Sequence, residues 1–285
     1  MARGGKDLER LLRHVELTVT RRLDGMLRGS FPSALPGPGS EPDASREYTP
    51  GDDVRRMDWA VTARTGVPHV RDPEAERELE AWIVIDAAQR LNAGTGAITK
   101  RHLLVDACAA VALLNSGPGD RTALLADGQL VPPARGRAAM LRIMDTAARH
   151  EGGGGLAADL MSLPARAPHA GLIVVISDFL GDFSWSEPLR VLAARTDVMA
   201  IHLVDPADVE LPGEGPVVLS DADSGQRLSF TVTERLRRDY AAQAAQHREQ
   251  VHAELRRCRA ETIELRTDRD WVTDMARQLS RKAGR

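Results

Sequence analysis

The sequence predicts an α/β protein with a mostly parallel sheet covered by helices on both faces, a helical and charged N-terminal extension, and a small β-hairpin insertion. From residue 81 onward, short apolar runs rich in branched residues alternate with helical patterns. These runs are continuously apolar, which is typical of parallel strands buried on both faces. The chain has 285 residues, 42% of them hydrophobic, so it can bury a sizeable core.

The individual elements follow from apolar spacing and turn residues. The predicted strands are 81–85, 122–126, 172–176, 198–204 and 262–265, and the predicted helices are 98–114, 138–148, 189–194 and 271–279. A hairpin turn at Gly128 follows the second strand, and the glycine run 152–155 is expected to be a flexible loop. A second hairpin is expected within 207–232, and Thr231 with Glu234 forms a capping-box pattern that opens a long helix to about residue 260.

The N-terminal region differs in character from the rest. Residues 6–28 predict a helix with arginines on its polar side, and residues 29–45 predict a loop rich in Gly, Pro and Ser. We expect the helix to pack on its own domain, and peripheral membrane contact is the alternative. The expected division is a segment 1–75 with helix, loop and charged block, and an α/β domain 76–285.

Charge and composition exclude several classes of function. The net charge is −3, from 41 acidic and 38 basic residues, whereas a nucleic-acid binder needs a basic excess to displace counterions. Aromatic residues make up only 4%, which disfavours a base-stacking platform. We therefore expect no nucleic-acid partner.

Cysteine usage and hydropathy point to the cytoplasm. Cys108 and Cys258 belong to no CxxC pair and are expected to be buried free thiols in a reducing compartment. The longest apolar runs, 107–114 and 172–176, are far shorter than the roughly 20 residues that cross a bilayer. The N-terminus lacks the apolar region of a signal peptide. A soluble, cytoplasmic protein with no transmembrane segment is expected.

Common catalytic motifs are absent from the sequence. It contains no GxSxG, no HExxH, no Walker A motif and no GxGxxG after a strand. The segment 94–100 resembles a phosphate loop only faintly and is expected to be a plain strand-to-helix connection. The eight histidines are scattered, and His14, His102 and His202 are expected to have no chemical role.

A dense charged block covers residues 46–64. Gly51 permits a tight turn, Asp52 or Asp53 can cap a short helix, and Arg55 and Asp58 are spaced to pair on one helical face. Three interpretations are open: a salt-bridged corner, a partner-binding surface, and a metal or general-base cluster of acidic residues. Nearby arginines in equal number compete with a cation and disfavour the third.

Two apolar residues flank Asp58 in this block. Met57 and Trp59 beside it suggest that the aspartate is buried, and Trp59 also offers an anchor or a cation–π face to a partner.

The charged block resembles the signature of a bacterial family, domain of unknown function 58. That signature is roughly R-x-Y-x-x-G-D-D-x-R-x-[IM]-D-W-x-x-x-A-R. The matching positions are Arg46, Tyr48, Gly51, Asp52, Asp53, Arg55, Asp58, Trp59, Ala63 and Arg64. The similarity extends over about residues 8–280.

The resemblance implies a von Willebrand factor A-like domain, which is a doubly wound α/β sheet. Its Mg²⁺ site has a D-x-S-x-S motif after the first strand, a threonine, and an aspartate after the fourth strand. Here the motif reads Asp86-Ala-Ala88-Gln-Arg90, and only Asp86 and Asp178 remain. Arg90 could place its guanidinium where the cation would sit. We expect a degenerate, metal-free site without cofactor.

The rim of this degenerate site is a candidate interface. Arg90, Phe179 and Trp185 are expected there, because aromatic residues and arginine are common interface anchors.

The resemblance also implies a function. Family members resemble companions of MoxR-type AAA+ ATPases, thought to act together in chaperone-like assembly or activation of other proteins. The expected function is thus a non-enzymatic protein-interaction module with a MoxR-type ATPase and an unknown client protein as partners. The alternative is a metal-dependent hydrolase that uses Asp52, Asp53 and Asp58.

Overall fold

The computed structural model describes residues 45–50, 52–71, 79–95, 98–117, 119–150, 152, 155–220 and 226–283. The helix expected at 6–28, nearly all of the loop expected at 29–45, and Gly51 of the signature lie outside these residues. Within them, no helix is both long and apolar enough to span a membrane.

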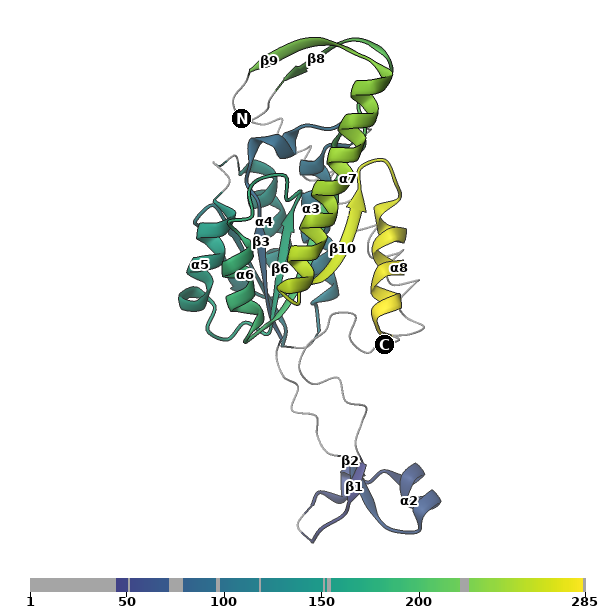
Figure 1. Cartoon of the computed structure of the whole chain (residues 1–285). Helices are drawn as coiled ribbons and strands as arrows, with labels where there is room; N and C mark the ends of the chain where they lie inside the picture. The colour runs from purple at the N-terminus through teal and green to yellow at the C-terminus, as the bar shows by residue number, and fades with distance from the viewer. Residues whose placement is uncertain are drawn as a thin grey trace.

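The protein is a mixed α/β structure around a mostly parallel six-stranded sheet (Figure 1). The strand order is β10-β7-β6-β3-β4-β5, and only the β4–β5 pair is antiparallel. The strands are β3 (Glu80–Ile85), β4 (Arg121–Ala126), β5 (Gln129–Ala134), β6 (Leu172–Ser177), β7 (Asp197–Val204) and β10 (Glu261–Arg266). The first strand of this sheet is β3, and later strands are added on both of its sides, as the doubly wound sheet implied by the family resemblance predicts.

Helices cover both faces of this sheet. Their bounds are α3 (Lys100–Leu114), α4 (Gly136–Arg149), α5 (Leu156–Arg166), α6 (Ser186–Ala193), α7 (Glu234–Arg257) and α8 (Trp271–Ala283). Helices α3, α4 and α8 pack on one face, and α5, α6 and α7 pack on the other. Helix α5 was not expected, although its buried Leu156, Leu160 and Leu163 recur at helical spacing; Pro164 lies inside it.

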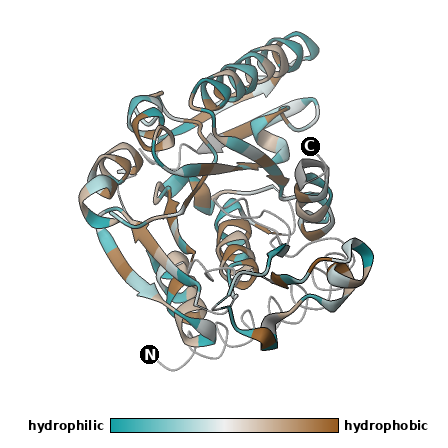
Figure 2. Cartoon of the chain, turned by 90° about the horizontal axis from the view of Figure 1, so that it is seen from below, coloured by the Kyte–Doolittle hydropathy of each residue, from teal (hydrophilic) through white to brown (hydrophobic). Residues whose placement is uncertain are grey.

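The two packed layers explain the apolar strands. Along β3, Ile83 and Ile85 face one layer while Trp82 and Val84 face the other. Every residue of β3 is buried, so no polar alternation remains in the sequence. Figure 2 shows hydrophobic colouring gathered on the strands and on the helix faces turned toward them.

The second hairpin forms as expected, from β8 (Gly215–Ser220) and β9 (Arg227–Val232). The cap of the long helix differs from the expectation. Thr231 pairs with Pro216 inside β9, and the side chain of Thr233 accepts the hydrogen bond from Leu236 N at 3.2 Å. Helix α7 begins at the hairpin and runs down along the sheet (Figure 1), and only Val251 and Leu255 of the helix are buried.

The charged block forms a small unit of its own. Strand β1 (Ser45–Glu47) pairs antiparallel with β2 (His69–Arg71). Between them lie a 3₁₀ turn, η1 (Val54–Arg56), and α2 (Trp59–Thr65), which ends at Gly66 with φ 74°. No residue of α2 is buried, so this unit is held together by hydrogen bonds more than by a core.

Both cysteines are buried and free, as expected. Burial raises the pKa of the Cys258 thiol, which makes it a poor nucleophile at neutral pH.

Candidate functional site

The carboxylates of the charged block have separate structural roles. Asp52 makes a two-pronged pair with Arg46, at 2.8 Å from Nη1 and 2.7 Å from Nη2. This pair, with the hydrogen bond from Thr49 N, holds the pKa of Asp52 well below its usual range. Asp53 caps η1 by accepting from Arg55 N at 3.0 Å. These are the contacts of a structural corner.

Asp58 is buried, as expected, and acts as the N-cap of α2. Its Oδ1 accepts from Ala60 N and Val61 N, both at 3.1 Å, and its Oδ2 accepts from Ser45 Oγ at 2.8 Å. Asp58 therefore ties the start of α2 to β1. Within the described residues, Asp52, Asp53 and Asp58 do not gather into a group with ligand-like spacing.

Trp59 does not share the burial of its neighbour. Its side chain is 70% exposed, and Val54 is 58% exposed in the same unit. Tyr48 joins the unit through its backbone N, which donates to Pro68 O, and Arg64 is exposed on α2. An exposed tryptophan is unusual because burying its large apolar ring away from water lowers the free energy of the folded protein. The unit thus presents apolar side chains to solvent.

A second group of charged residues lies at the point where the sheet winds in two directions. Asp86 follows β3 and Asp178 follows β6, and these neighbouring parallel strands connect to opposite sides of the sheet. Open α/β sheets bind ligands at this position, outside the carboxyl ends of the strands. We call Asp86, Arg90, Lys100, Asp178 and Asp208 the switch-point cluster.

Asp86 is held by three neighbours. Its Oδ1 accepts from Ala88 N at 2.9 Å, and its Oδ2 accepts from Ser177 Oγ at 2.8 Å and also from Arg90 Nη2. The carboxylate is almost completely buried. Ser177 thus connects β6 to the turn after β3.

Asp178 receives both cations of the cluster. Arg90 Nε donates to Oδ1 at 3.0 Å, and Lys100 Nζ donates to Oδ2 at 2.7 Å. Lys100 Nζ also lies 3.1 Å from each oxygen of Asp208, which belongs to the 3₁₀ turn η3 (Pro206–Asp208) after β7. The expected pairing of Arg90 with both remnant carboxylates is present.

The cluster is charged despite its burial. Burial alone would raise the pKa of Asp178, but Lys100 and Arg90 outweigh burial and lower it. Burial would likewise lower the pKa of Lys100, and Asp178 and Asp208 raise it instead. For Asp208 burial prevails over Lys100, and its pKa is raised. Asp178 and Lys100 are therefore a fully ionised buried pair at neutral pH.

The role of Lys100 was missed from the sequence. The segment 94–100 does connect a strand region to a helix, but its lysine points into the cluster instead of toward solvent. Thr99 caps α3 and so sets the direction of Lys100 at the first helical position. The sequence offered one signal for this role: Lys100 is a lysine in a chain whose basic residues are nearly all arginines.

The aromatic rim expected beside the cluster is not present. Phe179 and Trp185 are 1% and 3% exposed, and their ring centroids lie 4.9 Å apart inside the layer of α5, α6 and α7. Phe179 has a positive φ of 51°, which turns the chain inward directly after Asp178. Only Arg90 of the three expected rim residues reaches solvent, with 24% of its side chain exposed.

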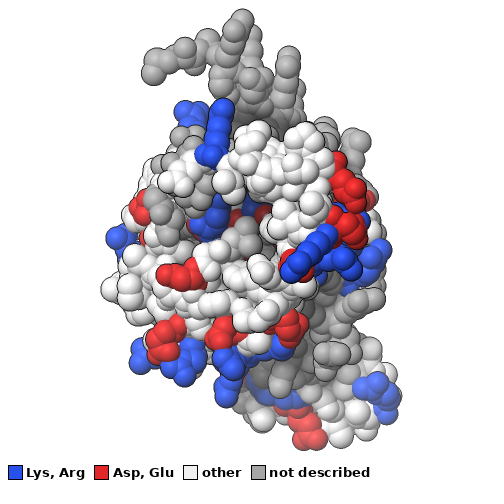
Figure 3. All heavy atoms as spheres, turned by 45° about the horizontal axis from the view of Figure 1, so that its top comes forward, with Lys and Arg blue, Asp and Glu red and all other residues white. Residues whose placement is uncertain are grey.

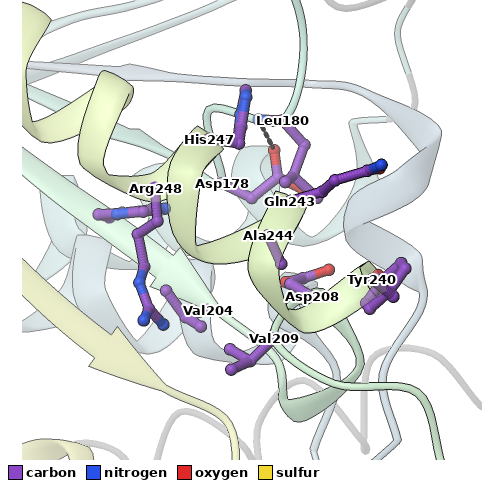
Figure 4. Close-up of a pocket in the computed structure, with 11 residues that line it drawn as sticks. Asp178, Leu180, Val204, Asp208, Val209, Tyr240, Gln243, Ala244, His247 and Arg248 are labelled. Atoms are coloured by element: carbon purple, nitrogen blue, oxygen red, sulfur yellow. Dashed lines mark hydrogen bonds between the residues drawn. The ribbon is translucent and has the colours of Figure 1, made fainter. Parts of the chain in front are cut away.

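A pocket of about 260 Å³ adjoins the cluster between the end of β7 and α7 (Figure 4). Asp178 and Asp208 form part of its wall, and Tyr240 and Arg248 stand at opposite ends. Tyr240 OH donates to Ala207 O at 2.7 Å, which anchors α7 over η3. The face at the carboxyl ends of the strands is hollowed near its centre, with charged atoms of both signs inside the hollow (Figure 3).

The cluster does not fit a magnesium ion. Mg²⁺ needs an octahedron of oxygen ligands, several of them waters. Asp86 and Asp178 instead direct oxygens to Arg90 and Lys100, and Ala88 has no oxygen in its side chain. A divalent cation would have to displace buried, paired positive charges. The cluster is an internal ion-pair network, with the pocket beside it.

The protein is thus a mixed α/β structure in which the charged residues of the switch-point cluster pair with one another. The model of the family described as "Protein of unknown function DUF58" matches residues 44–250, and the chain belongs to that family. Uncharacterized proteins of Mycobacterium bovis and Mycobacterium tuberculosis are 49% identical over 297 residues, covering 100% of this chain and 94% of theirs.

Two solved structures are similar to this chain. One is an aerotolerance-related membrane protein from Bacteroides fragilis, with a TM-score of 0.44 and 12% identity over 72% of this chain and 98% of that one. The other is the conserved hypothetical protein BatB from Bacteroides thetaiotaomicron, with a TM-score of 0.43 and 12% identity over 73% of this chain and 100% of that one.

Proposed function

We propose that this protein is a non-enzymatic, cytoplasmic interaction module with a von Willebrand factor A-like domain. Its partner in this proposal is a MoxR-type AAA+ ATPase, with which it acts in chaperone-like assembly or activation of other proteins. The choice of partner rests on the family resemblance of the charged block.

One observation carries the proposal. Trp59 belongs to the family signature, yet its side chain is 70% exposed in a unit whose helix α2 buries nothing. A signature tryptophan with a purely structural role would be expected in a core. Exposed aromatic residues are favoured anchors of protein interfaces, which supports a docking role for the unit of residues 45–71.

The switch-point cluster supports the non-enzymatic part. Its carboxylates are paired with Arg90 and Lys100, so none is a free general base or metal ligand. A site whose charges already satisfy each other offers no obvious chemistry to a substrate. The cluster instead fixes the loops after β3, β6 and β7 relative to one another.

A capture experiment tests the proposal. The full chain is immobilised, and the purified MoxR-type ATPase of the same organism is applied with and without ATP. We expect saturable capture by the wild type, and at least tenfold weaker capture by Trp59→Ala, about 1.4 kcal/mol. Met161→Ala is the matched control, because Met161 is 64% exposed on α5 in the other part of the chain.

Two outcomes contradict the proposal. Equal capture by Trp59→Ala and Met161→Ala would remove the docking role of the N-terminal unit. Turnover of phosphoesters that depends on a divalent cation and on Asp52 or Asp58 would replace the interaction module with the hydrolase alternative.

A further inference from the structure

Two histidines and a glutamate from three separate elements meet beneath α7. His202 lies on β7, Glu264 on β10 and His252 on α7. The parallel register places His202 beside Glu264, so both side chains leave the sheet on the face that α7 covers. Over the described ranges, this is the one group of three or more His, Cys, Asp or Glu residues whose ligand atoms all lie within 4.8 Å of one another.

The three ligand atoms are held together by one long hydrogen bond and one contact beyond hydrogen-bond length. His202 Nδ1 lies 3.4 Å from His252 Nε2, which in turn lies 3.8 Å from Glu264 Oε2. Favourable N–H···O bonds are about 2.7–3.2 Å long. Around a tetrahedral zinc ion with bonds of about 2.0–2.1 Å, neighbouring ligand atoms stand roughly 3.4 Å apart. The ligand atoms all lie within 4.8 Å of one another, so small side-chain rotations would bring the three onto one ion.

His202 is prepared to act as a ligand. Its side chain is buried beneath α7, and Nδ1 is the ring atom that faces His252. A hydrogen bond to the backbone of Asp178 and an edge contact with the Phe179 ring at 5.6 Å hold the imidazole in place. Metal-bound histidines are commonly oriented by such a bond from the second ring nitrogen.

We propose that His202, His252 and Glu264 bind a Zn²⁺ ion. Two imidazole nitrogens and one carboxylate suit zinc and exclude Mg²⁺ and Ca²⁺, which prefer oxygen ligands alone. The side chains of His252 and Glu264 are 29% and 31% exposed, so an ion can enter from solvent. Three protein ligands leave a fourth position for water or for a group from a partner.

The site would fasten α7 to the sheet. Only the C-terminal part of α7 is buried, and His252 lies between its buried residues Val251 and Leu255. An ion shared with β7 and β10 would add a cross-link at that point. Arg248, one turn earlier on α7, is a nearby cation that opposes binding, and the carboxylate of Glu264 offsets it. The proposal goes beyond the interaction module and does not depend on it.

Zinc titration of the metal-free full chain tests the site. The protein is stripped with a chelator, and ZnCl₂ is added in a calorimeter at pH 7.5. We expect one saturable site per chain, and affinity at least tenfold weaker in His252→Ala and in Glu264→Gln. Both residues are partly exposed, so these variants are expected to fold, and circular dichroism is the check. His169→Ala and Glu187→Gln, exposed residues outside the group, are the matched controls.

Thermal unfolding gives a second measurement. An ion that binds only the folded state raises the midpoint as its concentration increases. Zn²⁺ is expected to raise the midpoint of the wild type and of both controls, to leave His252→Ala unchanged, and Mg²⁺ at the same concentration is expected to have no effect. No saturable zinc binding by the wild type, or binding undiminished in both His252→Ala and Glu264→Gln, would overturn the proposal. Because no ATPase is present, these results are independent of the capture experiment.

Discussion

Replacing Lys100 with methionine tests whether the switch-point cluster holds the domain together. Lys100 is 3% exposed, and its ammonium group lies 2.7 Å from Asp178 and 3.1 Å from Asp208. Methionine keeps much of the length and apolar character of the side chain but removes the charge. Asp178 would retain Arg90, whereas Asp208 would lose the cation that the structure shows beside it.

The expected cost follows from burial. Removing one partner of a buried ion pair costs about 3–5 kcal/mol, because the remaining charge stays out of water without compensation. A typical domain has only about 5–15 kcal/mol of stability, so the loss should be large and easily measured. The double variant Lys100→Met/Asp178→Asn should be less destabilised than the sum of the single variants, by roughly 1–3 kcal/mol.

Denaturant unfolding with guanidinium chloride measures these differences. The control is Arg235→Met, since Arg235 and Asp239 form an exposed pair at 3.7 Å with side chains 88% and 63% exposed. Such surface pairs contribute under about 1 kcal/mol. A Lys100→Met variant no less stable than Arg235→Met, with an unchanged denaturant slope, would refute the conclusion that the cluster is a buried structural network.

Four further variants or conditions test other parts of the structure. Asp58→Ala removes the cap of α2 and should cost that helix about 1–2 kcal/mol, measured as faster hydrogen exchange of its amides with no change in the α/β domain. Trp185→Ala should destabilise the α/β domain by about 3–5 kcal/mol in denaturant unfolding, because the ring is buried; a change under about 1 kcal/mol would restore the interface interpretation. Burial raises the pKa of Asp106, on α3, to about 7, above its unfolded value of 3.8. This carboxyl therefore lowers the free energy of unfolding as pH rises between these two values. Asp106→Asn should therefore exceed the wild type in stability at pH 8, by on the order of 4 kcal/mol at most, and the gap should close near pH 4. Calorimetry with Mg²⁺ should show no saturable binding at sub-millimolar affinity, because Arg90 and Lys100 already neutralise the carboxylates.

Much of the sheet could be read from local patterns. A strand covered on both faces must be apolar at every position, and β3 and β6 are therefore visible as the runs 81–85 and 172–176. The acidic residues directly after these strands were also visible, since Asp86 and Asp178 end the runs. Bringing them together with Arg90 took the family resemblance, which implies a shared site at the ends of these strands.

Other features depend on contacts that local patterns do not encode. Lys100 meets Asp178, which is 78 residues away, and Asp208, which is 108 residues away. His202, His252 and Glu264 have no motif spacing and meet only because β7 and β10 are neighbours beneath α7. Phe179 and Trp185 looked like a rim in a loop sequence, but both rings are buried in the core, and Phe179 has a positive φ.

The physical reason for this division is the range of the interactions involved. Periodicity records which side of an element faces the core, because each residue is buried or exposed by its own position along a strand or helix. Ion pairs and ligand groups form between elements. Which residues meet depends on strand order and register, and sequences with the same periodicity can differ in both. The layers of this protein were therefore visible in the chain, whereas the partners of its buried charges and histidines came into view only with the packed fold.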